Sequence, residues 1–270
     1  MEASVTSQSY ADVFIKRLSN GAETAYLAGP CVDAVRDLVD VHDFVSPQVH
    51  VLASERAINR AMDDFMVAAL AAECVDSGQL SFRVADLDVN NVLVTPQSTT
   101  SLVEIDTGVS GPTTDPTALY GQSFDEIDAA WGDSDHYDLP APPVSTVRRT
   151  LESALSQAAA RNFWTFLETV DAVPTRGNYG VSAVELAILA SAAEGHLLND
   201  VCSWADSVGL ASHATCSRKK RKLEAAGIIV SDEECSGGQG APAQRLHLTE
   251  SFQEIPTYEL AERAQDALDD

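Results

Sequence analysis

The hydrophobic positions of the N-terminal half change repeatedly between short continuous runs and helical spacing. Thr24–Ala28 and Val49–Leu52 are apolar runs of a length typical of buried strands. Between them, apolar residues from Val32 to Val39 recur every three or four positions, which predicts the buried face of a helix. A strand, a helix and a second strand joined by short connections favour two parallel neighbours in one sheet.

The same alternation continues to about residue 131. Further helices are predicted over 9–18, over 55–76 as one long element capped by Ser54, and over 115–131. Further strands are predicted at Leu80–Val84, Val92–Val94 and Ser101–Ile105. The last strands are close enough in sequence to form an antiparallel hairpin. We therefore expect an α/β N-terminal domain with a mixed, partly parallel sheet and flanking helices.

The chemistry of this first domain points away from a nucleotide-cofactor enzyme. The turn at 28–30, Ala-Gly-Pro, matches neither the dinucleotide fingerprint nor the P-loop. No nucleophile elbow occurs, and His42, His50 and His136 have no evident partners. A small-molecule enzyme built on this domain is therefore the weaker alternative, and we expect no cofactor.

Gly132–Pro143, rich in proline, aspartate and glycine, separates this pattern from the rest of the chain. We expect an α/β sensor or dimerisation domain over 1–132, a linker and connecting helix over 133–180, and a DNA-binding domain over 181–270. The linker offers four candidate ligands for a hard metal ion: Asp133, Asp135, His136 and Asp138. It lacks the glycine and the terminal glutamate of an EF-hand loop, so a solvated loop is the preferred interpretation.

The C-terminal pattern opens with two helices. Ser182 and Glu185 form a capping box ahead of an Ala- and Leu-rich helix that reaches His196. Apolar residues between Val201 and Val208 share one face at helical spacing, which predicts a second helix.

A short turn then leads to a third helix, which Ser212 can cap and Gly227 can end. Strands predicted at 228–230 and 245–248 flank a glycine-rich loop at 236–242, and a last amphipathic helix is predicted over 257–268. This order of elements is typical of a winged helix-turn-helix domain. In such a domain the second helix of the helix-turn-helix motif lies in the DNA major groove.

Charge singles out the third helix. The chain has 270 residues, 17 Lys plus Arg against 41 Asp plus Glu, and a formal net charge of −24. The many acidic side chains repel one another in the compact protein unless salt screens them. This favours a cytoplasmic protein of an extreme halophile. Five of the scarce basic residues nevertheless stand in a row at 218–222. A run of basic residues most often forms a solvent-exposed face. Because this run lies in the third helix of a helix-turn-helix pattern, we favour contact with DNA.

Residues at the start of this helix are the candidates for reading base edges: Ser212, His213, Thr215, Ser217 and Arg218. Candidates for phosphate contacts are Lys219, Lys222 and Arg221, and on the wing strand Arg245 and His247. Lys220 stands at a position that normally faces the core, so we expect its stem to lie on apolar surface and its head to reach solvent. The alternative is a module that docks this helix on an acidic protein partner.

The five cysteines and the hydropathy add little chemistry. The number of cysteines is odd and no CxxC pair occurs, which fits reduced, mostly buried thiols. The cysteines are Cys31, Cys74, Cys202, Cys216 and Cys235. No stretch approaches the roughly 20 apolar residues that cross a bilayer. We expect no membrane association.

Three stretches give the chain a family resemblance: Met62–Ala68 with the following Leu80–Val94, Pro142–Arg148, and Ser203 through Ile229. On these the sequence resembles the TbsP family of haloarchaeal transcriptional regulators. The resemblance implies an N-terminal α/β domain, a C-terminal winged domain, and control of sugar or central carbon metabolism genes. A homodimer on promoter DNA is the default, since operators are often two-fold. A small-metabolite effector of the N-terminal domain is a further hypothesis.

Overall fold

The computed structural model describes residues 5–7, 9–19, 23–105, 108–111, 113–114, 119–171, 181–234 and 243–269. The chain divides into two compact units, Met1–Val144 and Ser145–Asp270. The helices α6 (Val144–Ala154) and α7 (Gln157–Asp171), which we expected in a connecting segment, therefore lie almost wholly within the second unit.

The first unit is built on a seven-stranded mixed sheet with the order β10-β4-β3-β2-β5-β6-β9. Its strands are β2 (Thr24–Ala28), β3 (Gln48–Ala53), β4 (Leu80–Val84), β5 (Val92–Thr95), β6 (Ser98–Ser101), β9 (Thr113–Thr114) and β10 (Asp135–His136). Strands β2, β3 and β4 are parallel, whereas β5 and β6 form an antiparallel hairpin beside β2. The expectation of a partly parallel sheet with a terminal hairpin is confirmed.

A strand expected at Ser101–Ile105 is divided between two sheets. Ser101 ends β6, and β7 (Val103–Ile105) joins a small antiparallel sheet of order β1-β8-β7, with β1 (Val5–Ser7) and β8 (Gly108–Gly111). Leu102 between them is buried, and its N–H donates to the carbonyl of Asn91 at 2.7 Å. This anchor turns the chain from one sheet to the other.

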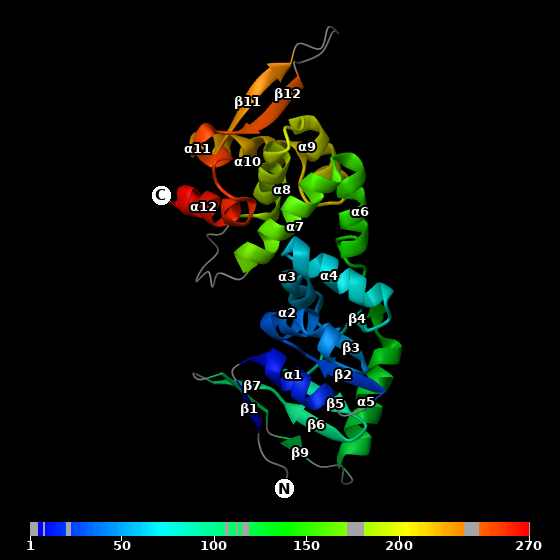
Figure 1. The fold of residues 1–270 in the computed structure, drawn as a ribbon. Coiled ribbons are helices and arrows are strands. Elements are labelled where there is room, and N and C mark those ends of the chain that lie inside the picture. The colour runs from blue at the N-terminus through cyan, green and yellow to red at the C-terminus, as the bar shows by residue number, and fades with distance from the viewer. Residues whose placement is uncertain are drawn as a thin grey trace. The chain divides into compact units, whose positions relative to one another are not determined.

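Helices cover both faces of the large sheet (Figure 1). On one face lie α1 (Tyr10–Leu18), α2 (Val32–Asp40), α3 (Glu55–Ala61) and α4 (Phe65–Asp76). Alternate strand residues such as Leu27, Val51 and Phe82 are fully buried in this layer. The opposite face carries α5 (Leu119–Asp133), whose Trp131 packs against the rings of Tyr26 and His50.

The prediction of a single helix over 55–76 is wrong, because the helix is interrupted at Met62–Asp64. Met62 ends α3, and Asp64 begins α4 by accepting hydrogen bonds from Met66 N–H at 2.8 Å and Val67 N–H at 3.3 Å. A carboxylate that caps free amides stabilises a new helix start even where the apolar periodicity continues.

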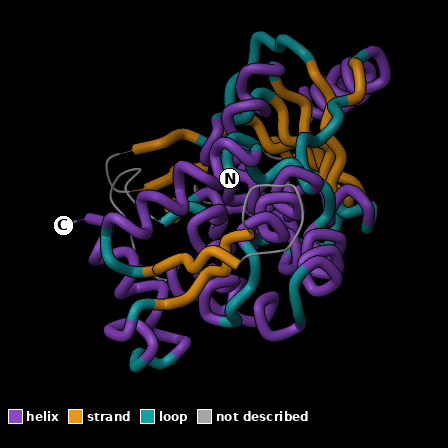
Figure 2. The backbone as a smooth tube through the Cα atoms, turned by 90° about the horizontal axis from the view of Figure 1, so that it is seen from above, coloured by secondary structure: helices purple, strands orange, loops and turns teal. Residues whose placement is uncertain are grey.

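The second unit is helical around α8 (Ala183–Ala193), whose residues 184–192 are all buried. Around it lie α7, α9 (Leu198–Ser207), α10 (His213–Ala225) and the hairpin of β11 (Ile229–Glu234) with β12 (Ala243–Leu248). The chain continues into α11 (Glu250–Gln253) and α12 (Thr257–Asp269). Figure 2 draws the strands in orange and the helices in purple. The expected winged helix-turn-helix fold is confirmed; its loop at 236–242 lies outside the described residues.

Candidate DNA-binding surface

The turn between α9 and α10 sets the two helices of the motif at an angle. Gly209 has φ +76°, a left-handed conformation that favours glycine, and Leu210 N–H donates to the carbonyl of Ala205 at 2.8 Å. The apolar face predicted for α9 is buried, and the indole of Trp204 donates to Thr150 Oγ1 at 3.2 Å. Helix α9 is thus a fixed support for α10.

Both ends of α10 follow the sequence prediction. Ser212 Oγ accepts from Thr215 N–H at 3.3 Å, which caps the first turn. At the other end Gly227 has φ +69°, and Ile228 N–H donates to the carbonyl of Leu223 at 3.0 Å.

One face of α10 is buried and the opposite face is exposed. Cys216, Lys220 and Leu223 point into the core. Arg218 and Arg221 are exposed on the outer face, and neither forms an ion pair with any residue that the structure describes. They are the two cations of the basic run that point outward without an acidic partner in the described chain.

Lys219 and Lys222 contact an acidic side chain of α8. Lys219 Nζ lies 3.2 Å from Glu185 Oε2, and Lys222 Nζ lies 3.7 Å from Glu185 Oε1. The Glu185 side chain is 1% exposed, whereas those of Lys219 and Lys222 are 27% and 50% exposed. Two of the predicted phosphate contacts therefore also neutralise a buried carboxylate.

Lys220 is buried, as its position predicted, but its head does not reach solvent as we expected. Its Nζ lies 2.8 Å from Glu224 Oε1 and donates to Gln244 Oε1 at 3.3 Å. Glu224 also accepts from Ser231 Oγ at 2.8 Å. The ammonium stays inside because Glu224, one helical turn away, and Gln244 on the wing strand replace the water that it would otherwise contact.

The two predicted wing residues lie on one face of β12 and are partly exposed. Arg245 Nη1 donates to the carbonyl of Gly195 at 2.5 Å, and its backbone bridges to Leu197. His247 Nε2 lies 3.8 Å from Asp232 Oδ2. Arg245 therefore fastens the wing strand to the turn after α8, and His247 faces the neighbouring strand.

The predicted residues at the start of α10 come together on one exposed end of the helix. Ser212 and His213 are exposed, and Thr215 and Ser217 are half-buried. Sequence reasoning missed the acidic partners Glu185 and Glu224. The capping box had identified Glu185 only as a helix start, because pairing across helices leaves no local signal.

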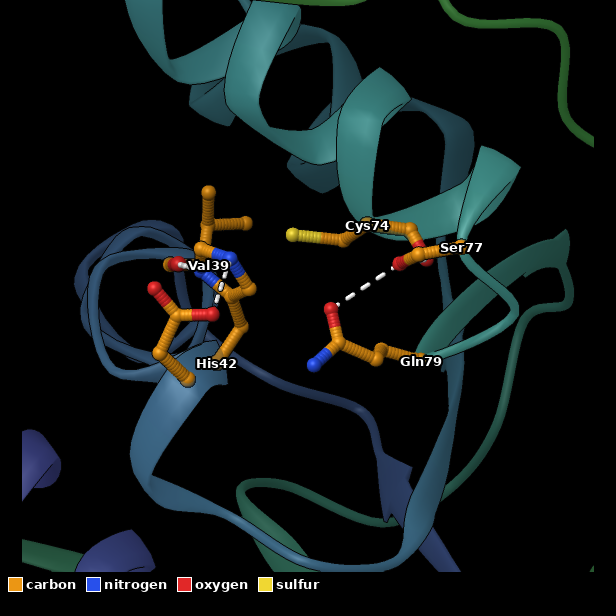
Figure 3. Close-up of polar contacts among 6 residues, drawn as sticks. Val39, His42, Cys74, Ser77 and Gln79 are labelled. Carbon is orange, nitrogen blue, oxygen red and sulfur yellow. Dashed lines mark hydrogen bonds and ion pairs between the residues drawn. The ribbon is translucent and has the colours of Figure 1, made fainter.

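Cys74 and His42 of the first unit invite comparison with the Cys–His pair of nucleophilic enzymes. In Figure 3 the thiol of Cys74 points towards the imidazole of His42. However, His42 uses Nδ1 on the carbonyl of Val39 at 2.7 Å and Nε2 on Asp43 at 3.2 Å. Burial raises the pKa of Cys74 to about 12. Protonated sulfur beside an imidazole with both nitrogens occupied lacks the features of an activated nucleophile.

His50 and His136 also have partners that the sequence did not reveal. His50 Nδ1 is hydrogen-bonded to Ser81 Oγ at 2.5 Å, and His136 Nδ1 lies 3.4 Å from Asp138.

Within the described ranges, the side chains of His, Cys, Asp and Glu do not gather in threes that could hold a metal ion. Each described helix is too short or too polar to cross a membrane.

The fold and the basic helix define the class of protein as a helix-turn-helix transcriptional regulator, and comparison with known families agrees. The N-terminal model of TbsP-like transcriptional regulators matches residues 2–142, and the C-terminal helix-turn-helix model of the same family matches residues 143–265. The chain belongs to the TbsP-like family of transcriptional regulators.

Other comparisons are more distant. Comparison with curated proteins found no match. Among solved structures, the chain is similar to TrmBL2, an archaeal chromatin protein described as showing a novel mode of DNA binding. The identity is 10% and the TM-score 0.35, and the match covers 50% of this chain and 54% of that chain.

Proposed function

We propose that the protein is a sequence-specific regulator that binds double-stranded promoter DNA with α10 in the major groove. The observation that carries the proposal is the outer face of α10, where Arg218 and Arg221 are exposed without an acidic partner in the described chain. Arginine pairs bidentately with the O6 and N7 acceptors of guanine. An unpaired arginine on the helix that enters the groove is suited to that contact.

The charge distribution supports the same proposal. Residues 145–270 contain 11 of the 17 basic residues but only 18 of the 41 acidic ones. The formal charge is thus −7 in this unit and −17 in residues 1–144, so DNA phosphates are repelled less by the second unit, which carries the exposed cations of α10. In this arrangement Ser212, His213, Thr215, Ser217 and Arg218 read base edges, and Arg221 with the half-exposed Lys222 holds phosphates.

Lys219, Arg245 and His247 have secondary roles in the proposal. Lys219 and Arg245 each make a polar contact inside the protein, with Glu185 and with the Gly195 carbonyl respectively. Arg245 and His247 lie on the same face of the wing strand, from which they can approach a phosphate.

Finer features of the proposal come from charge and family. A net charge of −24 suits a cytoplasm with molar salt, where repulsion is screened within about 3 Å. Membership of the TbsP-like family favours genes of sugar or central carbon metabolism as targets. We further propose a homodimer on two-fold operators. The first unit then serves as the dimerisation domain or as the sensor of a small metabolite.

The first experiment measures binding to genomic promoter fragments and to scrambled DNA of equal length in molar potassium chloride. Wild type is compared with Arg218→Ala and with Arg149→Ala, which removes an exposed arginine of α6. Selective binding that only Arg218→Ala loses is the expected result. Absence of selective binding by the wild type would overturn the proposal and favour an acidic protein partner for α10.

A further inference from the structure

We infer that Glu185 is a positioning residue for DNA recognition: it fixes the rotation of α10 by holding Lys219 and Lys222, so that Arg218 and Arg221 face outward. This inference rests on the proposed function. It also assigns Lys219, and in part the half-exposed Lys222, to holding the helix, and Arg218 and Arg221 to contacting DNA.

Glu185 is itself held rigidly at the start of α8. Its Oε2 accepts from Ser182 N–H at 2.8 Å and from Ser182 Oγ at 2.6 Å. Burial raises the pKa of Glu185, but the Ser182 hydrogen bonds and the charge of Lys219 outweigh it and hold the pKa below its usual value. The first turn of a helix also favours a negative charge. The buried group is therefore a fixed carboxylate.

The carboxylate contacts α10 at two points. Oε2 faces Lys219 at 3.2 Å and Oε1 faces Lys222 at 3.7 Å, and these lysines lie one turn apart on the same side of the helix. Oε1 accepts no hydrogen bond from any described residue, so Lys222 is the group that neutralises it. Two contacts to one immobile group resist both rotation and sliding of α10.

A change in the rotation of α10 would disrupt these contacts. A step of one residue turns an α-helix by about 100° and would carry Lys219 and Lys222 away from Glu185. In one direction the step would turn Arg218 and Arg221 inward towards the carboxylate, and it would also move Cys216 and Leu223 out of the core. The Glu185 contacts and the buried face of α10 therefore act together to keep Arg218 and Arg221 on the outer face.

The arrangement also has a consequence for specificity. A lysine that neutralises Glu185 contributes less to phosphate attraction, which is independent of DNA sequence. Glu185 thus lowers binding to arbitrary DNA while it orients the residues that read bases. Both effects increase the ratio of specific to non-specific affinity.

The test compares Glu185→Gln with Glu262→Gln, which makes the same charge change at an exposed position of α12. For each we measure affinity for the selected promoter fragment and for scrambled DNA, as a function of potassium chloride concentration. With Glu185→Gln we expect the specificity ratio to fall about tenfold or more, corresponding to about 1.4 kcal/mol. The slope of log affinity against log salt should steepen by about 0.9 for each lysine released to a phosphate.

Glu262→Gln should change both affinities alike and leave the ratio unchanged. If Glu185→Gln also leaves the ratio and the slope unchanged, or lowers both affinities in parallel, the inference is wrong. If the wild type binds the promoter fragment no more tightly than scrambled DNA, the proposed function itself is contradicted.

Lys219→Met tests the inference without disturbing Glu185 and serves if Glu185→Gln does not fold. We expect specific affinity to fall severalfold while the salt slope stays the same. A slope that becomes shallower by about 0.9 would identify Lys219 as an ordinary phosphate contact and overturn its positioning role.

Discussion

Lys220 and Glu224 form an ion pair within α10 in which the ammonium lies 2.8 Å from the carboxylate and the lysine side chain is only 9% exposed. The same ammonium donates to Gln244 on β12, and the same carboxylate accepts from Ser231 on β11. The pair thus connects the helix that is proposed to enter the groove with both strands of the wing. Helix and wing are expected to move as one body.

Replacement of Lys220 should therefore reduce stability through lost packing and lost hydrogen bonds. We expect Lys220→Ala to lower the free energy of unfolding by about 1–3 kcal/mol. Lys220→Met keeps the packing of the apolar stem and should cost less, whereas the hydrogen bond from Ser231 to Glu224 remains in both variants. Denaturant unfolding in molar potassium chloride measures both, with the exposed Arg221→Ala as a control that changes stability by about 0.5 kcal/mol or less. Equal losses for Ala and Met would contradict the role of the stem.

Sequence reasoning succeeded where the determinants are local. Ser212 and Gly227 mark the ends of α10, because an N-cap hydroxyl and a left-handed glycine act within one turn. The burial of Lys220 also followed from its spacing to Leu223. The partners of Lys219 and Lys222 did not, because Glu185 lies on another helix, more than 30 residues away.

Arg218 and Arg221 should differ in what their loss does to DNA binding. Arg218, nearer the start of α10, is expected to contact a base, so Arg218→Ala should cost about 1–3 kcal/mol and relax preference at one base pair. Arg221 is expected to contact a phosphate, so Arg221→Ala should weaken binding to all sequences and reduce the salt slope by about 1. Competition binding with single-base variants of the promoter fragment distinguishes the two. Uniform weakening by Arg218→Ala would assign that residue to a phosphate instead.

Gly29 should be among the least replaceable residues of the first unit. It follows β2 with φ +59°, and a Cβ at this position would overlap the carbonyl oxygen of Val89. Gly29→Ala is expected to cost more than about 2 kcal/mol, since it combines left-handed strain with a backbone clash. Gly78→Ala is the matched control: φ is +76°, but nothing lies within 4 Å, so about 1 kcal/mol is expected. Similar losses of melting temperature for both variants would show that the clash is relieved by movement of the loop.

The same contact bears on the metabolite hypothesis. A ligand would bind at the carboxyl ends of β2 and β3 if the sheet followed the usual rule for parallel strands. There the loop that carries Val89 lies on Gly29, and Asn91 Oδ1 accepts from Cys31 N–H at 2.6 Å. This loop comes about 60 residues after Gly29, so the turn sequence at 28–30 gave no sign of it. The sequence predicted the strands β2, β3, β4 and β5 but not what covers their ends.

His50 should make the stability of the first unit depend on pH. Burial, followed by the charge of Arg83, lowers its pKa below the ordinary value of 6.5, while Asp128 acts in the opposite direction. The imidazole packs between the rings of Tyr26 and Trp131 and is hydrogen-bonded to Ser81. As the pH falls below about 6.5, the unfolded chain takes up a proton at this position that the folded unit does not. Stability is therefore lost between about 6.5 and the lower folded pKa, by up to about 1.4 kcal/mol per pH unit.

His50→Gln removes this titration, so its free energy of unfolding should fall less steeply with acid than that of the wild type. The measurement is denaturant unfolding at a series of pH values at constant salt, followed by circular dichroism. His136→Gln, which removes an imidazole that is 65% exposed in the same unit, should keep the steepness of the wild type. Parallel curves for wild type and His50→Gln would show that the pocket formed by Tyr26, Ser81 and Trp131 accepts the charged imidazole.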